Sequence, residues 1–352
     1  MYTTTSFEYQ PAVAEPSQWP AATLRSSPSL PSNSRRHSQG LAVVDNEKDA
    51  LTLLKIKEQF GNPAALGPWR NGTDHCIWWI GAECDEHRRV IYLFFRGRMN
   101  ITSTLPPAIG ELDQLQAITI VDMPGLSGPI PDTFGDLSCL STLNIVGTSV
   151  SGAIPASLSR ATSLASINLS RNKLSGSIPR SLGEGLSRLV YFNAANNYLV
   201  GAIPARLVRG GTANSPAALT LSNNRLTGKI PWTYAVESNL MQLWVANNRL
   251  VGDASFLFGR RKAMVYMDLS GNRLRFNLTG VEMPDDLQEL NLARNRIYGR
   301  VPATLRQSKV VALDLSYNEL CGEIPTGGQM VRFEAAAYVH NKCLCGTPLP
   351  SC

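Results

Sequence analysis

No stretch of the 352-residue sequence approaches the roughly 20 apolar residues that a membrane-spanning helix requires, because the longest apolar run covers only residues 90–95. Charged residues are scarce, at 17% of the chain against roughly a quarter in an average protein. Histidine occurs four times, at His37, His75, His87 and His340. The sequence as written is therefore not expected to be a membrane-anchored receptor kinase, and it offers few candidates for a histidine general base.

Motifs of the common catalytic sites are missing as well. The chain contains no H-E-x-x-H metal motif, no G-x-S-x-G nucleophile elbow and no G-x-x-x-x-G-K phosphate loop. Asp268 and Glu289 come nearest to the carboxylate pair of a sugar hydrolase, but their positions fit a solvated surface better. We predict a protein that is not an enzyme and uses no cofactor and no metal.

The first residues and the net charge carry weaker information. Residues 1–44 are rich in Ser, Thr, Pro and Arg and lack the apolar core of a secretory signal, so we expect them to be disordered. The net charge of +6 favours an anionic neighbour such as an acidic polysaccharide or an acidic protein. Cations cluster only at residues 88–89, 96–98 and 260–262, too sparsely for nucleic-acid binding.

What the sequence does contain is an internal repeat. The frame Leu-x-x-Ile-x-Leu-x-x-Asn-x-Leu-x-Gly-x-Ile-Pro, read from residue 164, also starts at residues 90, 115, 140, 189, 216, 240, 264, 287 and 310. The steps between the ten units run 25, 25, 24, 25, 27, 24, 24, 23 and 23 residues. This period and spacing predict an α/β leucine-rich-repeat solenoid with ten repeats over residues 90–325.

Each position of the frame has a physical role. The first six residues form a short strand, and stacked units share one continuous core because no unit can bury its apolar stripe alone. The resulting parallel sheet is expected to be curved, with its outward side chains on the concave face. The ninth-position asparagines should turn inward and form a ladder that satisfies buried backbone groups: Asn172, Asn197, Asn224, Asn248, Asn272, Asn295 and Asn318.

Caps are expected at both ends of the solenoid. Residues 45–62 show an amphipathic helical pattern that begins near Asp45 and Asn46, and they open an N-terminal cap over residues 45–89. Its apolar stripe contains Ala50, Leu51, Leu53, Leu54, Ile56, Lys57 and Phe60. Residues 326–352 are predicted to form a disulfide-bonded C-terminal cap.

Seven cysteines allow three bridges and leave one thiol. The pairing Cys76–Cys84, Cys321–Cys343 and Cys345–Cys352 leaves Cys139, which we expect to be a partly exposed free thiol or an intermolecular bridge. Zinc at the Cys343-x-Cys345 end, with His340 nearby, is the rival interpretation, although the spacing is not that of a zinc knuckle. Four sequons fit secretion: Asn71, Asn100, Asn168 and Asn277.

The sequence resembles the plant polygalacturonase-inhibiting proteins over residues 45–352. The resemblance rests on two consecutive units that break the Gly-x-Ile-Pro rule, at residues 252–255 and 276–279, on residues 295–299 and 317–322, and on the cysteine-rich ending of residues 340–352. Two departures are evident. No cysteine occurs near Asp45, and His75 replaces the first cysteine of a Cys-Cys doublet, so both partners of one family disulfide are missing.

The resemblance implies a secreted cell-wall glycoprotein of plant defence that inhibits fungal endopolygalacturonases with its concave face. On the unit frame, the outward candidates for protein binding are Asn168, Ser170, Arg171, Tyr191, Asn193, Thr220, Ser222, Gln242, Trp244, Tyr266 and Asp268. Trp244 and Tyr191 are the preferred anchors, because aromatic side chains dominate interface energetics.

Two other function classes stay open. One is a docking module for a peptide or a receptor ectodomain in developmental or immune signalling. The other is a structural wall protein that binds ice or pectin. The irregular outward residues disfavour ice, and pectin binding is expected to use Arg88, Arg89, Arg96 and Arg98.

Overall fold

The predicted repeats form one long sheet. The computed structural model describes residues 39–352 except 210, 212–215 and 237–238. Its main sheet has eleven strands in chain order, antiparallel between β1 and β2 and parallel from there on. The strands are β1 (Ala82–Cys84), β2 (Val90–Arg96), β4 (Ala117–Val121), β6 (Thr142–Val146), β8 (Ser166–Asn168), β10 (Tyr191–Asn193), β12 (Ala217–Thr220), β14 (Leu240–Trp244), β16 (Tyr266–Asp268), β18 (Glu289–Asn291) and β20 (Ala312–Asp314).

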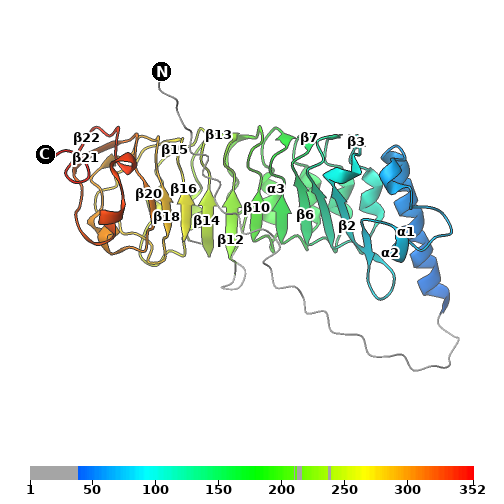
Figure 1. Cartoon of the computed structure of the whole chain (residues 1–352). Coiled ribbons are helices and arrows are strands. Elements are labelled where there is room, and N and C mark those ends of the chain that lie inside the picture. The colour runs from blue at the N-terminus through cyan, green and yellow to red at the C-terminus, as the bar shows by residue number, and fades with distance from the viewer. Residues whose placement is uncertain (1–38, 210, 212–215, 237–238) are drawn as a thin grey trace, which may run out of the picture. The chain divides into compact units, whose positions relative to one another are not determined.

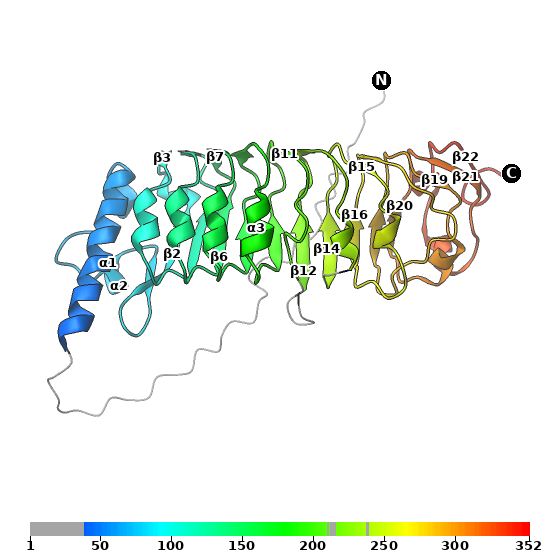
Figure 2. The ribbon, with the colours of Figure 1, turned by 180° about the vertical axis from the view of Figure 1, so that it is seen from behind.

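The predicted leucine-rich-repeat solenoid is confirmed, because β2 to β20 supply one strand for each of the ten units. The sheet forms one side of the solenoid, and short helices cover the opposite side (Figures 1 and 2). These helices are α3 (Arg180–Gly185), η4 (Pro107–Glu111), η5 (Asp132–Asp136), η6 (Ala156–Arg160), η7 (Trp232–Ala235), η8 (Ser255–Leu257) and η9 (Ala303–Gln307).

Small sheets run along the edge that joins these two sides. They are the four-stranded β3 (Ser103–Thr104), β5 (Leu126–Gly128), β7 (Ser149–Gly152) and β9 (Lys173–Leu174), the pair β11 (Val200–Gly201) and β13 (Arg225–Leu226), the pair β15 (Val251–Gly252) and β17 (Arg273–Leu274), and the three-stranded β19 (Tyr298–Gly299), β21 (Glu319–Glu323) and β22 (Cys343–Cys345). Each unit therefore adds one strand to the main sheet and, in most cases, one short strand to this edge.

The asparagine ladder is present as predicted. Asn197 shows the pattern: its Nδ2 donates to the carbonyl oxygen of Leu169 in the preceding unit at 2.9 Å, and its Oδ1 accepts from the Leu174 backbone N–H at 2.9 Å. The other predicted asparagines bond in the same way, and Asn341 adds a further rung in the C-terminal cap. Buried backbone groups of adjacent units are thereby satisfied, which fixes the distance between units.

The Gly-x-Ile-Pro element turns the chain from the edge to the helical side. Gly176 has φ +74°, a left-handed conformation that suits glycine, and Pro179 precedes helix α3. The two irregular units behave differently. Residues 252–255 still lead into η8, whereas no helix forms between β17 and β18, where residues 276–279 lack the proline.

The N-terminal cap contains helix α1 (Gln39–Gln59), which begins six residues before the helical pattern that the sequence predicted from residue 45. Residues 39–44, which we expected to be disordered, continue the helix upstream because Leu41 to Val44 contain no helix breaker. The rest of the expected disorder, residues 1–38, lies outside the described residues. No helix among the described residues has both the length and the apolarity to cross a membrane.

Helix α1 buries Leu53 and Ile56 against the first unit, and Phe60, directly after the helix, meets Phe95 edge-on at 5.4 Å between ring centroids. Leu51, predicted to belong to this stripe, is 55% exposed because it lies on the opposite side of the helical turn. The cap continues through η2 (Ala64–Leu66), α2 (His75–Trp78) and the stacked Trp69 and Trp79 rings.

A buried ion network joins α1 to the repeats. Asp49 is 1% exposed and accepts hydrogen bonds from Arg89 Nε at 3.0 Å, from Arg89 Nη2 at 3.2 Å and from the Val90 backbone N–H at 2.9 Å. Arg89 Nη2 also contacts Asp113 at 2.5 Å. This network ties helix α1 to the first repeats.

All three predicted disulfides are present, Cys76–Cys84, Cys321–Cys343 and Cys345–Cys352. Cys139 is a half-buried free thiol. The rival zinc site at Cys343, Cys345 and His340 is wrong for this oxidised state, since both cysteines are disulfide-bonded. The C-terminal cap closes with η10 (Gly328–Arg332) and η11 (Ala335–Ala337), and Tyr338 is fully buried beneath it.

Candidate functional site

Strand register aligns the predicted binding residues in two rows across the open face of the sheet. Tyr191, Gln242 and Tyr266 lie in one row, with Ala218 between the first two. The second row contains Asn168, Asn193, Thr220, Trp244 and Asp268. Neighbouring strands are about 4.8 Å apart, so five repeats bring residues 100 positions apart in the sequence within about 20 Å.

The two preferred anchors occupy different rows. Trp244 lies between Thr220 and Asp268, and Tyr191 lies between Ser166 and Ala218. Both aromatic side chains are half-buried. Burial raises the pKa of Tyr191, although the Asn193 amide that donates to its hydroxyl oxygen at 3.2 Å lowers it. The strand between them, β12, carries the small residues Ala218 and Thr220, which are 5% and 8% exposed.

Three of the residues predicted to lie outward on the sheet face follow a strand and lie elsewhere or are partly buried: Ser170, Arg171 and Ser222. Ser170 is 7% exposed and donates its hydroxyl to Asn168 Oδ1 at 2.8 Å, while Ser222 is half-buried. Arg171 does not lie in the middle of the face. It lies beyond the end of β8 with φ +59°, is exposed, and faces Asp122 at 3.5 Å. The reason is local: the next residue is a ladder asparagine that turns inward, so the chain must bend at Arg171.

Sequence reasoning missed the row of residues equivalent to Arg171. Asn196, Asn223 and Asn247 all have positive φ and are exposed. Their side-chain amides form a chain in which Asn223 donates to Asn196 at 2.9 Å and Asn247 donates to Asn223 at 2.8 Å. This exposed amide chain borders the two rows along one side and adds hydrogen-bonding groups to the face.

Acidic residues occupy one end of the face. The pKa of Asp268 is raised, mainly by burial and to a lesser extent by the charge of Asp314. Hydrogen bonds from Ser270 oppose this increase. Burial and the charge of Asp268 raise the pKa of Glu289. Glu289 pairs with Tyr266 and Asp268 with Asn291 in the sheet, so the two carboxylates are diagonal neighbours and not directly opposed.

Asp268→Asn should raise the melting temperature at pH 7 by roughly 1–2 °C, the scale of a modest single-site gain in a long chain. A carboxyl group with a raised folded-state pKa favours folding while it is protonated. That stability is present below its unfolded pKa of about 4 and is lost as pH rises through the folded pKa. Asparagine keeps the acceptor for the Ser270 N–H, 3.0 Å away. Scanning calorimetry at pH 7 and pH 3 measures the shift, and an equal gain at pH 3 contradicts the explanation.

A basic stripe, also missed from the sequence, runs along the edge that carries the small sheets (β9 and β13 lie on it; β13 is labelled in Figure 1). It occupies the position directly after the ladder asparagine and is defined by Lys173, Arg225, Arg249, Arg273 and Arg296. All five are exposed, and none forms an ion pair within the described part of the chain. Tyr198 interrupts the stripe, and the Arg225 guanidinium carbon lies 5.0 Å from its ring centroid.

The arginines expected to bind pectin do not form a comparable group. Arg89 is 13% exposed and is neutralised by Asp49 and Asp113, which argues against it as a polysaccharide contact. Arg88 pairs with Asp74 at 2.5 Å, and Arg96 lies over the Phe94 ring at 4.4 Å. The side chain of Arg98 lies outside the described residues. The sequence suggested this group because its arginines are close together along the chain. In the structure, the exposed cations that lie together come from equivalent positions of successive units.

Three of the four sequon asparagines, Asn71, Asn100 and Asn277, are exposed in turns or at the edge. Asn168 lies on the sheet face, half-buried, with its Oδ1 bonded to Ser170. A glycan at Asn168 would stand among the two rows and obstruct binding there.

Known proteins resemble this chain along most of its length. Models of a leucine rich repeat N-terminal domain and of a leucine rich repeat match residues 46–85 and 163–184. "Polygalacturonase inhibitor 1" of Arabidopsis thaliana is 38% identical, over 87% of this chain and 92% of its own. "Polygalacturonase inhibitor 2" of Phaseolus vulgaris is 41% identical, over 92% and 94%. The crystal structure of a plant ice-binding protein superimposes with a TM-score of 0.79 at 38% identity, covering 87% of this chain and 97% of its own.

Proposed function

This chain belongs to the family of plant polygalacturonase inhibitors, and we propose that it binds and inhibits fungal endopolygalacturonases through its concave sheet face and so limits pectin degradation. The observation that supports the proposal is the alignment of polar and aromatic side chains in two rows on one stiff sheet. The protein itself acts as an inhibitor and not as an enzyme.

The physical basis is a preformed surface. The asparagine ladder and the shared core fix the strands, so residues such as Trp244 and Gln242 lose little conformational freedom when a partner docks. A bound solenoid lying over or beside the cleft of the enzyme would keep the polymer away from the catalytic groups. Inhibition of this kind needs no catalytic groups in the inhibitor. It needs only a large contact surface that is complementary in shape and charge to the enzyme.

Secretion to the cell wall is part of the same proposal. Three disulfides are typical of an oxidising compartment, and three exposed sequon asparagines suit glycosylation. The expected partner is a soluble polygalacturonase. A receptor ectodomain is the alternative partner, and ice binding is disfavoured because the rows mix Tyr, Ala, Gln and Asp without a regular array.

The test is an inhibition assay with purified protein and a panel of fungal endopolygalacturonases, measured as release of reducing ends from polygalacturonate. We expect slower hydrolysis by at least one enzyme, with saturation at equimolar inhibitor. Unchanged rates across a broad panel, together with co-purification of a membrane receptor, would favour the docking-module alternative instead.

The basic stripe favours pectin as a second ligand. Its five cations span five repeat steps, or about 24 Å, with one gap at Tyr198, and a row of this length suits a linear polyanion. The equivalent position holds Ser149 in the third unit and Glu319 in the tenth. The stripe is therefore confined to the fourth to ninth units. The enzyme-binding rows and the stripe lie on adjoining surfaces.

Replacing Arg225, Arg249 and Arg273 with glutamine should lower the affinity for immobilised polygalacturonate about tenfold or more at low salt, because exposed charges act through screened electrostatics. The parent protein should itself be released as salt is raised towards 1 M. The matched control replaces Arg180, Arg188 and Arg332 with glutamine, the same charge change outside the stripe. Equal retention of both triple variants would show that net charge alone binds the polymer.

A further inference from the structure

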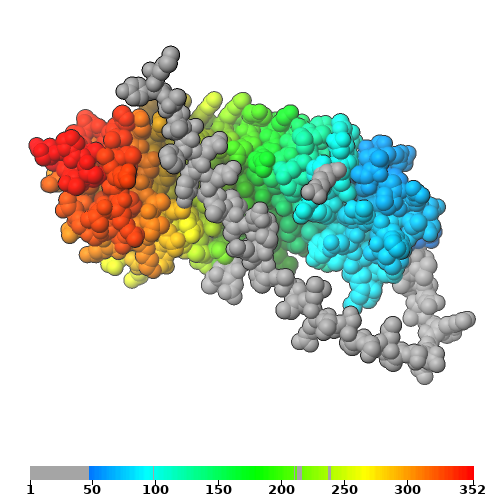
Figure 3. Space-filling view, in the orientation of Figure 1, coloured from blue at the N-terminus to red at the C-terminus, as the bar shows by residue number. Residues whose placement is uncertain are grey.

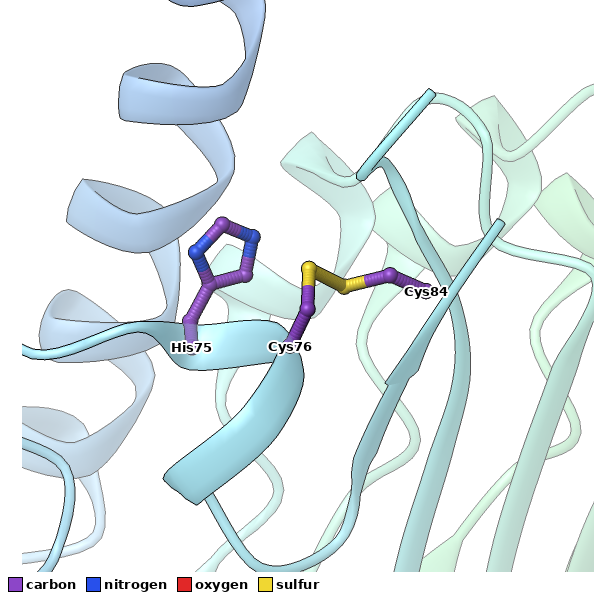
Figure 4. Close-up of side chains that lie close together, drawn as sticks. All are labelled: His75, Cys76 and Cys84. Atoms are coloured by element: carbon purple, nitrogen blue, oxygen red, sulfur yellow. A yellow bond between two sulfur atoms is a disulfide. The ribbon is translucent and has the colours of Figure 1, made fainter. Parts of the chain in front are cut away.

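The N-terminal cap contains a compact group of side chains that can ligate metals. His75, Cys76 and Cys84 each present one ligand atom, and the three atoms lie within 4.8 Å of one another. Figure 4 shows the His75 ring beside the sulfur of Cys76, at the start of α2, with Cys84 reaching across from β1. Among the described residues, no other group of histidine, cysteine and acidic side chains is as close.

His75 is the buried member of this group. Its side chain is 3% exposed, packs edge-on against Trp79 at 6.0 Å between ring centroids, and its Nε2 is buried without a hydrogen-bond partner. A buried nitrogen without a partner destabilises a protein unless something satisfies it.

The two cysteines form a disulfide whose Cα atoms are 5.5 Å apart. Both residues are half-buried, so a reductant has access to them. In a tetrahedral zinc site, two thiolates at about 2.3 Å from the metal are about 3.8 Å from each other. The reduced sulfurs therefore need to separate only modestly, while α2 and β1 continue to hold their backbones.

We propose that reduction of the Cys76–Cys84 disulfide converts this group into a binding site for Zn²⁺ or a similar thiophilic divalent cation, with His75, Cys76 and Cys84 as ligands. The disulfide takes two electrons and two protons from a dithiol, which becomes a disulfide itself. The cation then displaces the two thiol protons, and water completes the tetrahedron from the exposed side.

The exchange preserves the cross-link in the cap. A disulfide and a metal ion both tie α2 to β1, so the cap has a covalent link under oxidising conditions and a metal link under reducing ones. The C-terminal cysteines form no such group, because no third histidine, cysteine or acidic ligand atom gathers with either of their bridges among the described residues. They serve as an internal comparison within the same chain.

Cobalt is a suitable probe, since thiolate ligands give Co²⁺ a strong near-ultraviolet charge-transfer absorption. The full chain carrying Cys139→Ser is reduced without oxygen, freed of reductant and titrated with Co²⁺ at neutral pH. We expect an absorption that saturates at one equivalent and disappears when Zn²⁺ is added. His75→Ala should weaken Co²⁺ binding at least tenfold, and Cys76→Ser with Cys84→Ser should abolish the band while all C-terminal cysteines remain.

A thermal melt of the same reduced protein keeps the proposal testable if the variants fold poorly. Zn²⁺ should raise the melting temperature of the reduced parent by at least 3 °C, but not that of the oxidised parent. Any one of three results overturns the proposal: no band and no thermal shift in the reduced parent, a band that persists without Cys76 and Cys84, or unchanged affinity in His75→Ala.

Discussion

Replacing Trp244 with alanine should weaken inhibition of a responsive polygalacturonase by about 30- to 150-fold, the loss of about 2–3 kcal/mol that a central aromatic contact carries. Trp244 lies near the middle of the second row, flanked by the shorter side chains of Thr220 and Asp268. Its indole is half-buried on the sheet, and because it has only two side-chain torsions we expect docking to cost little side-chain entropy. The inhibition constant of purified protein measures the change directly.

Trp232 supplies the matched control. It is 62% exposed in η7, on the helical side of the solenoid, so Trp232→Ala removes the same side chain from the opposite surface. We expect inhibition within about twofold of the parent. If the Trp244→Ala variant inhibited as well as the parent protein and the Trp232→Ala variant inhibited less, the enzyme would bind the helical side. That result would refute the concave-face proposal.

Replacing Asp49 with alanine should lower the free energy of unfolding of the N-terminal cap by about 3–5 kcal/mol, because removal of one member of a buried ion pair leaves the other charge uncompensated. The remaining partner, Arg89, is 13% exposed and would keep only Asp113. The Val90 N–H would also lose its acceptor. Urea denaturation followed by tryptophan fluorescence, to which the stacked Trp69 and Trp79 of the cap contribute, measures the loss.

A double-mutant cycle distinguishes direct pairing from general damage. Asp49→Ala with Arg89→Ala should cost less than the sum of the single changes, since no unpaired charge remains. The surface pair Lys309–Asp286, 2.6 Å long with both side chains about two-thirds exposed, is the control. Asp286→Ala should change stability by no more than about 1 kcal/mol. Additive losses at Asp49 and Arg89 would contradict the proposed coupling.

Local sequence pattern alone determined the fold and the repeat phase, whereas the predicted cysteine pairing had rivals until the structure confirmed it. Repetition at a fixed period leaves one way to bury the apolar stripe, and β2, β4 and the later strands begin at or within two residues of the predicted unit starts. The inward asparagines followed from the same phase. The rows of the concave face were also predictable, because outward positions alternate with buried ones along each strand.

Only the tertiary structure determined which charges are free and which are paired. Arg89 looked like a surface cation, but it meets Asp49 and Asp113, which lie 40 and 24 residues away in the sequence. Arg171 was predicted to lie outward on the sheet face, yet the inward turn of Asn172 places it past the strand end. The basic stripe is the converse case: its members are dispersed along the sequence, and stacking brings equivalent positions about 5 Å apart. Sequence periodicity specifies what each unit is, whereas the contacts between units determine the charge pattern that a partner meets.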